Sequence, residues 1–96
     1  MPLNNSKIKK IIEQYLNEIN LSDVEVFYGS GSKIKIHTIT YSISQKSILV
    51  EAVIVLGGVI VEETLDRAPA ELMIQNCIPY LFPEISSVKV MTRWDV

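Results

Sequence analysis

Residues 47–61 read SILVEAVIVLGGVIV, a run whose sole charged side chain is Glu51. Alternate residues of a strand point to opposite faces. One face would carry Ile48, Val50, Ala52, Ile54 and Leu56, and the other Leu49, Glu51, Val53 and Val55. Both faces are apolar except at Glu51, which is typical of a strand covered on both sides. β-Branched residues dominate and no polar stripe recurs at helical spacing, so a central strand is favoured over a buried helix.

The apolar run contains Gly57-Gly58, a pair that permits the positive φ angles of a two-residue turn. We expect residues 59–61 to fold back after this turn as a second, shorter strand. A membrane-spanning helix needs roughly 20 apolar residues. This run is shorter and contains Glu51, so we expect no membrane span.

Length and composition indicate one domain over residues 1–96, because 96 residues with 48% hydrophobic content can build one core and not two. The net charge of −2 gives no bulk attraction to nucleic acid or anionic lipid. The single cysteine, Cys77, excludes an intramolecular disulfide and a cysteine-based zinc site, and it fits a reducing compartment.

The N-terminal residues hold no apolar core of a signal peptide, so we expect a cytoplasmic protein. Isoleucine far outnumbers alanine, which is a coding bias of AT-rich bacterial and phage genomes. We therefore interpret the chain as an accessory protein of bacterial or phage origin.

Two helices are predicted. In residues 6–21, apolar side chains recur at three- and four-residue spacing and form one stripe: Ile8, Ile11, Ile12, Tyr15, Leu16 and Ile19. Asn5 or Ser6 is expected to cap its start, and Asn20 to end it in a left-handed conformation. Residues 70–82 are apolar nearly all round, with Pro69 suited to the first turn and Pro79 expected to kink or end the helix.

The remaining segments predict strands. Residues 24–28 read as a short strand, and 29–32 as a flexible hairpin loop. A phosphate-binding loop is disfavoured there, because such a loop opens a helix and an apolar strand follows. In residues 33–43 the alternation of apolar and polar residues changes phase partway along. Either a β-bulge near His37-Thr38 brings the apolar residues to one side, or the strand is apolar on both faces. Residues 88–94 predict a final edge strand, with Lys89 and Arg93 on one face.

Together these elements predict an α+β fold: an N-terminal helix, an antiparallel sheet of four to five strands, and a second helix before a final edge strand. Two helices cover about one face of such a sheet, because a helix is about 10 Å across and strands lie about 4.8 Å apart. The other sheet face would stay exposed, and self-association, most simply as a two-fold homodimer, would cover it. One helix on each sheet face is the competing arrangement.

The predicted interface combines apolar side chains of the central strand and of the second helix: Leu49, Val53, Val55, Met73, Cys77 and Tyr80. We interpret Cys77 as a small core residue and not as a nucleophile, because apolar surroundings raise the pKa of a thiol. The expected partner is a second copy or another protein, and no cofactor is expected.

The function predicted first is a small non-enzymatic oligomeric interaction module, of the adaptor, chaperone-like or regulatory kind, because no catalytic or metal-binding constellation is recognisable. A separate polar site is predicted from four side chains: His37, Tyr41, Glu51 and Arg93. His37 is the only histidine, which leaves it without a second histidine for a metal site. We expect Glu51 to pair with Lys33, Lys35 or Arg93 on a neighbouring strand.

Two alternatives stay open. A basic sheet face could bind nucleic acid through Lys33, Lys35, His37, Lys89 and Arg93, with Tyr41 or Trp94 stacking on bases. A small ligand-binding protein or enzyme could instead use a pocket between helix and sheet, with His37, Tyr41, Glu51 and Asp95 as its polar groups.

Overall fold

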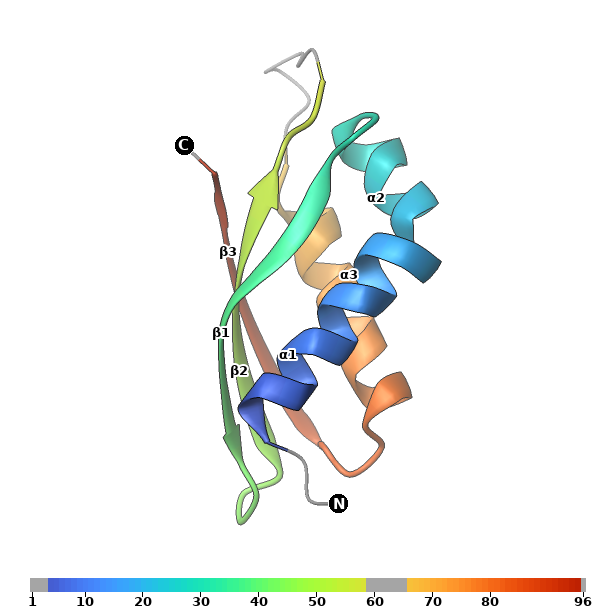
Figure 1. Cartoon of the computed structure of the whole chain (residues 1–96). Coiled ribbons are helices and arrows are strands. Elements are labelled where there is room, and N and C mark those ends of the chain that lie inside the picture. Colours follow the sequence, from blue (N-terminus) through green and yellow to red (C-terminus); the bar gives the residue numbers. More distant parts are fainter. Residues whose placement is uncertain (1–3, 59–65, 96) are drawn as a thin grey trace.

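The structure is a computed structural model, and it describes residues 4–58 and 66–95. The elements follow in the order α1 (Asn5–Gln14), the π-helical turn η1 (Tyr15–Ile19), α2 (Leu21–Tyr28), β1 (Lys33–Ser42), β2 (Ser47–Val55), α3 (Ala68–Leu81) and β3 (Ser87–Trp94). Figure 1 shows two layers, with the described helices all on one side of the sheet. The fold is therefore α+β, as predicted, and the arrangement with one helix on each face is wrong. The predicted strand at 59–61 lies outside the described residues.

The sheet has three strands in the order β1-β2-β3, so β2 is the central strand and β3 an edge strand, as predicted. β1 pairs with β2 antiparallel, but β2 pairs with β3 parallel. The prediction of four to five antiparallel strands was therefore wrong in both strand number and direction for the described part of the chain. The cause is α3, whose 14 residues carry the chain back by about 21 Å, so that β3 starts at the same end of the sheet as β2.

Residues 24–28, predicted to be a strand, belong to helix α2. Val24 and Tyr28 lie four residues apart and are both buried, whereas Val26 between them is 78% exposed. A strand would put all three residues on one face, whereas a helix puts Val24 and Tyr28 on one face and turns Val26 away from it. The glycines of 29–32 then join a helix to β1, with φ angles of 97° at Gly29 and 83° at Gly31.

The predicted helix at 6–21 is confirmed as α1 followed by η1. Its cap is Asn4 and not Asn5 or Ser6, because the Asn4 side chain accepts a hydrogen bond from the Lys7 amide at 2.9 Å. The Asn20 amide donates to the Tyr15 carbonyl at 2.9 Å, five residues back. This wider turn rotates Ile19 off the apolar stripe, and Ile19 is 73% exposed. Asn20 has a φ of −102°, so the expected left-handed ending is wrong.

The predicted β-bulge is confirmed, because the register of β1 against β2 shifts between Ile36 and Thr38. His37 is the extra residue, and Ile34, Ile36 and Ile39 consequently all face the core. The core lies between the sheet and the helices, where the buried apolar side chains of α1, η1, α2, α3 and the strands form one cluster. Pro79 lies inside the last turn of α3 without ending the helix.

Side chains from the helical layer close the outer edge of β1 near its start. Asn17 donates from Nδ2 to the Ile34 carbonyl at 2.8 Å and accepts from the Ile34 amide at 3.0 Å. Glu13 accepts from the Ile36 amide at 3.1 Å. Asn17 thus replaces a neighbouring strand, and these contacts leave less of the edge open to pairing with another chain.

The edge of β3 is occupied in a similar way. The guanidinium of Arg67, just before α3, donates to the Thr92 carbonyl. The Thr92 hydroxyl donates to the Glu71 carboxylate at 2.6 Å, so β3 is tied to the start of α3 by backbone and side chain alike. Contacts with the helical layer therefore occupy part of both edges of the sheet.

We predict that Asn17→Ala lowers the free energy of unfolding by about 1–3 kcal/mol, because it leaves the amide and carbonyl of Ile34 without their partner. Urea denaturation measures the loss. Asn76→Ala, at an exposed position on α3, is the matched control, and we expect it to change stability by less than about 0.5 kcal/mol. Equal effects of the two substitutions would contradict the role given to Asn17.

Candidate interaction surface on the open sheet face

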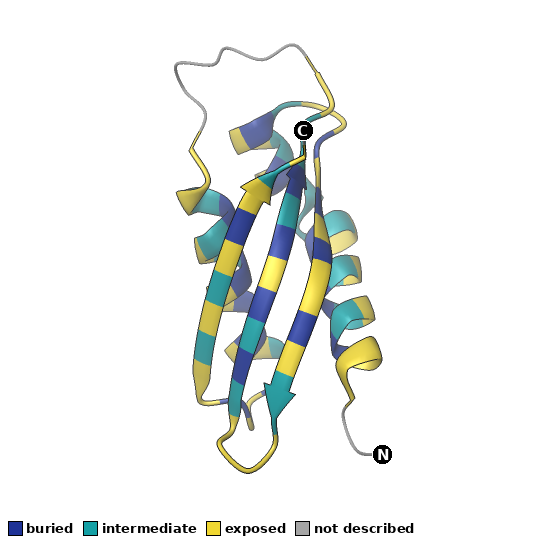
Figure 2. Cartoon of the chain, turned by 90° about the vertical axis from the view of Figure 1, so that its left-hand side faces the viewer, coloured by how far each residue is buried: buried dark blue, intermediate teal, exposed yellow. Residues whose placement is uncertain are grey.

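The central strand β2 has a covered side and an uncovered side. Ile48, Val50, Ala52 and Ile54 are buried against the helices. Leu49, Val53 and Val55 alternate with them, point away from the helical layer and are half-buried, and Glu51 on the same side is exposed. This agrees with the expectation that the helices cover one face of the sheet and leave the other exposed. Its covering by a partner stays a prediction. Figure 2 looks onto this uncovered side, which we call the open face.

The register places basic side chains on both sides of the apolar residues of β2. Val53 lies opposite Lys35 of β1 and Arg93 of β3. Leu49 lies between Thr40 and Lys89, and Val55 lies opposite Lys33. The open face is thus an apolar stripe (Leu49, Val53, Val55 and the neighbouring Met91) between two basic rails (Lys33 and Lys35 on β1, Lys89 and Arg93 on β3).

Among residues 4–58 and 66–95, basic side chains outnumber acidic ones on the open face. Lys33, Lys35, Lys89 and Arg93 lie there, against Glu51 and Asp95. A chain of net charge −2 therefore presents a locally positive surface on this side. Such a surface attracts acidic partners over about a Debye length, roughly 8 Å at physiological salt.

Glu51 lies at the middle of the apolar stripe, directly opposite Thr38 and Met91. Lys35 and Arg93, two of the predicted charge partners, both lie opposite Val53, one diagonal step away from Glu51. Diagonal neighbours on a sheet are about 7–8 Å apart, a separation that long side chains such as lysine and arginine can still span. Glu51 therefore stands exposed on the stripe with no basic residue directly across from it.

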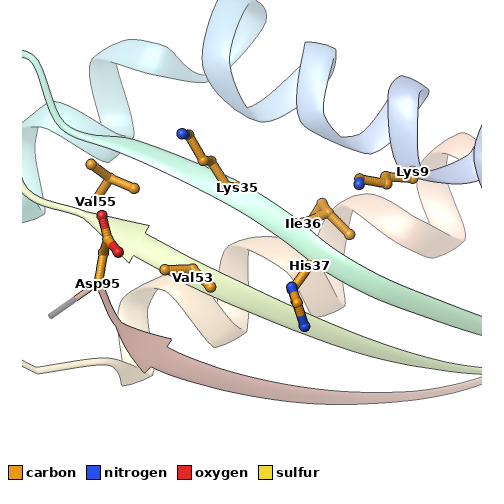
Figure 3. Close-up of a pocket in the computed structure, with 7 residues that line it drawn as sticks. All are labelled: Lys9, Lys35, Ile36, His37, Val53, Val55 and Asp95. Atoms are coloured by element: carbon orange, nitrogen blue, oxygen red, sulfur yellow. The ribbon is translucent and has the colours of Figure 1, made fainter.

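The structure brings part of the predicted polar site together. Glu51 and Arg93 line one hollow of about 130 Å³ on the open face, together with Met91. His37 is exposed on β1, whereas Tyr41 pairs with buried Ile48 and packs against the core. Figure 3 shows His37 at one end of a shallow hollow of about 220 Å³, which Lys35, Val53, Val55 and Asp95 also line. Within residues 4–58 and 66–95, no group of three or more His, Cys, Asp or Glu side chains could hold a metal ion.

The aromatic residues expected to stack on bases face the wrong way for the basic rails. Trp94 packs against the core, with its ring 6.0 Å from that of Tyr28 at an angle of 76°. Tyr41 also belongs to the packed side of the sheet. The basic residues of the nucleic-acid hypothesis thus share one face, as predicted, and both of its aromatic residues lie on the other.

The predicted interface residues divide between two surfaces. Leu49, Val53 and Val55 lie on the open face, while Met73, Cys77 and Tyr80 belong to α3 on the helical side. There they line a separate hollow of about 370 Å³ with four more side chains: Tyr15, Asn20, Asp23 and Asn76. The rings of Tyr15 and Tyr80 lie 6.0 Å apart. One continuous contact could not use both sets.

Cys77 is a core residue, since its side chain is only 4% exposed. Its thiol donates to the Ile74 carbonyl at 3.3 Å. Burial raises the pKa of this thiol from 9.0 to about 12. A thiol that keeps its proton at neutral pH is a poor nucleophile, so the geometry agrees with the structural interpretation of Cys77.

Sequence reasoning missed the contacts of Asn17, Glu13 and Arg67 with the sheet edges, and it missed the alternation of apolar stripe and basic rails. The contacts join residues 17 to 25 positions apart, and no local spacing marks them. The stripe and rails depend on the parallel register of β3, which the predicted antiparallel sheet did not contain.

Comparisons of this chain with family models, with curated proteins and with solved structures find no match. No helix in the described part is both long and apolar enough to cross a membrane.

We predict that the free energy of unfolding falls as pH rises from 9 towards 12, because the unfolded thiol of Cys77 ionises near 9.0 while the folded one keeps its proton to about 12. Below pH 9 the Cys77 thiol is protonated in the folded and the unfolded state, so ionisation of this thiol does not lower the free energy of unfolding there. Burial also raises the pKa of Tyr28 above 10.0, which adds to the fall at higher pH.

The measurement is urea denaturation at a series of pH values in wild type and in Cys77→Ala. The variant is expected to start from a lower stability, because it loses buried volume, and to show a shallower slope between pH 9 and 10. An identical slope in the two proteins would contradict the assignment to Cys77.

Proposed function

We propose that this chain is a non-enzymatic interaction module, of the adaptor, chaperone-like or regulatory kind, and that another polypeptide docks on its open face. One observation carries the proposal. The described helices all cover one side of a three-stranded sheet, and the other side keeps Leu49, Val53 and Val55 half-buried and Met91 54% exposed. Apolar residues gathered on an uncovered face and bordered by charged residues are typical of an interaction surface.

The placement of the reactive side chains supports a non-enzymatic role. Cys77 is buried in the helical layer, whereas His37 is exposed on the bulge of β1. Catalysis by such groups requires a nucleophile, a base and an orienting partner within hydrogen-bonding reach of one another. These two residues lie in different layers of the structure, so they do not form such a unit.

Nucleic-acid binding remains a second candidate, because Lys33, Lys35, Lys89 and Arg93 share one face with His37. Against it stand the apolar stripe between the rails and the inward packing of Tyr41 and Trp94. Base stacking supplies much of the affinity of single-stranded nucleic-acid binders. A protein partner explains the stripe as well as the rails, so it is the better supported of the two.

The homodimer predicted from the sequence stays a prediction. Static light scattering of the concentrated protein measures it directly, since the mass of a two-fold dimer rises to that of two chains once the protein concentration exceeds its dissociation constant. A mass of one chain throughout would exclude the dimer and leave docking of a different polypeptide in place.

We predict that Val53→Glu removes binding at the open face, because it places a second carboxylate in the apolar stripe beside Glu51. A yeast-displayed library of random peptides, sorted for binding to the labelled protein, supplies the ligands. The enriched peptides are expected to bind the Val53→Glu variant at least about tenfold more weakly than they bind wild type. A tenfold rise in Kd corresponds to about 1.4 kcal/mol of binding free energy.

Val26→Glu is the matched control, since Val26 is exposed on α2 in the opposite layer and the substitution adds the same charge. Circular dichroism verifies that both variants fold. Peptides that bind Val53→Glu as tightly as wild type, or a library from which nothing enriches, would overturn the proposed function.

A further inference from the structure

The dimensions of the open face fit one α-helix. The outer strands of three neighbouring strands lie about 10 Å apart, and an α-helix with its side chains is about 10 Å across. From Leu49 to Val55 the stripe runs for about 20 Å at about 3.3 Å per residue. That length corresponds to about 13 residues of helix at 1.5 Å each.

The charge pattern of the open face disfavours a second copy as the occupant. Two-fold stacking about an axis along the strands sets the basic rail of β1 against that of β3. Like charges facing one another across an interface oppose association.

Charge complementarity defines the flanks of the occupant. Lys33 and Lys35 border the stripe on one side, and Lys89 and Arg93 border it on the other. A helix whose apolar side rests on the stripe turns its flanking positions towards these rails. Acidic residues at those positions would meet a basic side chain on either side, and basic residues would be repelled.

Glu51 defines the middle of the occupant. It interrupts the apolar stripe between Leu49 and Val53 and has Thr38 and Met91 directly opposite. Covering an exposed carboxylate with an apolar surface is costly, whereas a lysine or arginine of the partner would neutralise it. One central basic residue in the docked helix would therefore fix its position along the stripe.

We propose, building on the function proposed above, that the open face binds an amphipathic helix of a partner protein. This helix lies along β2 with its apolar side on Leu49, Val53, Val55 and Met91. Acidic residues flank its apolar side, and one lysine or arginine near its centre meets Glu51.

Two synthetic helical peptides of about 14 residues test this inference. Both carry the same leucine stripe and one central lysine, and they differ in having glutamates or lysines at the flanking positions. Fluorescence anisotropy of the labelled peptides measures binding to the full chain. We expect the glutamate peptide to bind, more weakly as salt is raised, and the lysine peptide to bind at least about tenfold more weakly.

The double variant Lys35→Glu, Arg93→Glu reverses one residue of each rail. It is expected to lose about tenfold in affinity for the glutamate peptide and to gain affinity for the lysine peptide. Lys7→Glu, Lys10→Glu reverses two exposed charges of α1 and is the matched control for net charge. Because both variants change surface residues, circular dichroism and urea denaturation can verify that they stay folded.

The outcomes separate this inference from the proposed function. Equal binding of the two peptides, or an unchanged affinity in the double variant, overturns the acidic helix. No binding of either peptide overturns it too. The proposed function stands in each case if library peptides still depend on Val53. Displacement of those peptides by a single-stranded oligonucleotide, in a salt-dependent manner, would overturn both in favour of nucleic acid. A two-chain mass that Val53→Glu reduces to one would assign the open face to a second copy.

Discussion

The structure depends on the burial of one side of β2. Ile48, Val50, Ala52 and Ile54 meet the helical layer, and every other described element takes its place around that contact. α1 and η1 supply Ile8, Ile12 and Leu16, and α3 supplies Ile74 and Ile78, all of them fully buried. Fully burying each of these isoleucine, leucine and valine side chains contributes on the order of 1.5–3 kcal/mol, so this one side of a strand and its partners supply a large share of the driving force of folding.

The other side of β2 then carries the functional argument. Within residues 4–58 and 66–95, the helices all lie on the other side of the sheet and leave this face uncovered. The apolar stripe is narrow, and the basic rails on both sides keep it hydrated and discourage pairing between identical faces. Asn17, Glu13 and Arg67 meanwhile occupy backbone groups at the two sheet edges. The molecule thus restricts contact at its edges and concentrates it on one face, where charge and shape can discriminate between partners.

Periodicity predicted the elements whose pattern is local. The apolar stripe of α1, the central position of β2, the bulge at His37 and the bounds of α3 to within a few residues followed from spacing alone. The strand predicted at residues 24–28 was wrong because the positions of Val24, Val26 and Tyr28 fit the alternation of a strand as well as they fit a short helix. The parallel pairing of β3 was not predicted, because the direction of a strand depends on the end of the sheet to which α3 returns the chain. For the same reason the individual open-face residues could be guessed, but their arrangement as a stripe between rails could not.

The parallel pairing has a consequence for synthesis on the ribosome. The helices before β1 and the β1–β2 hairpin emerge first, and β3 arrives only after α3 has been made. Until then β2 is an edge strand, its backbone groups on that side lack a neighbour, and its Val- and Ile-rich sequence is the kind that pairs with other nascent chains. Translation speed over α3 and β3 therefore sets how long this side of β2 stays without its neighbouring strand in each new molecule.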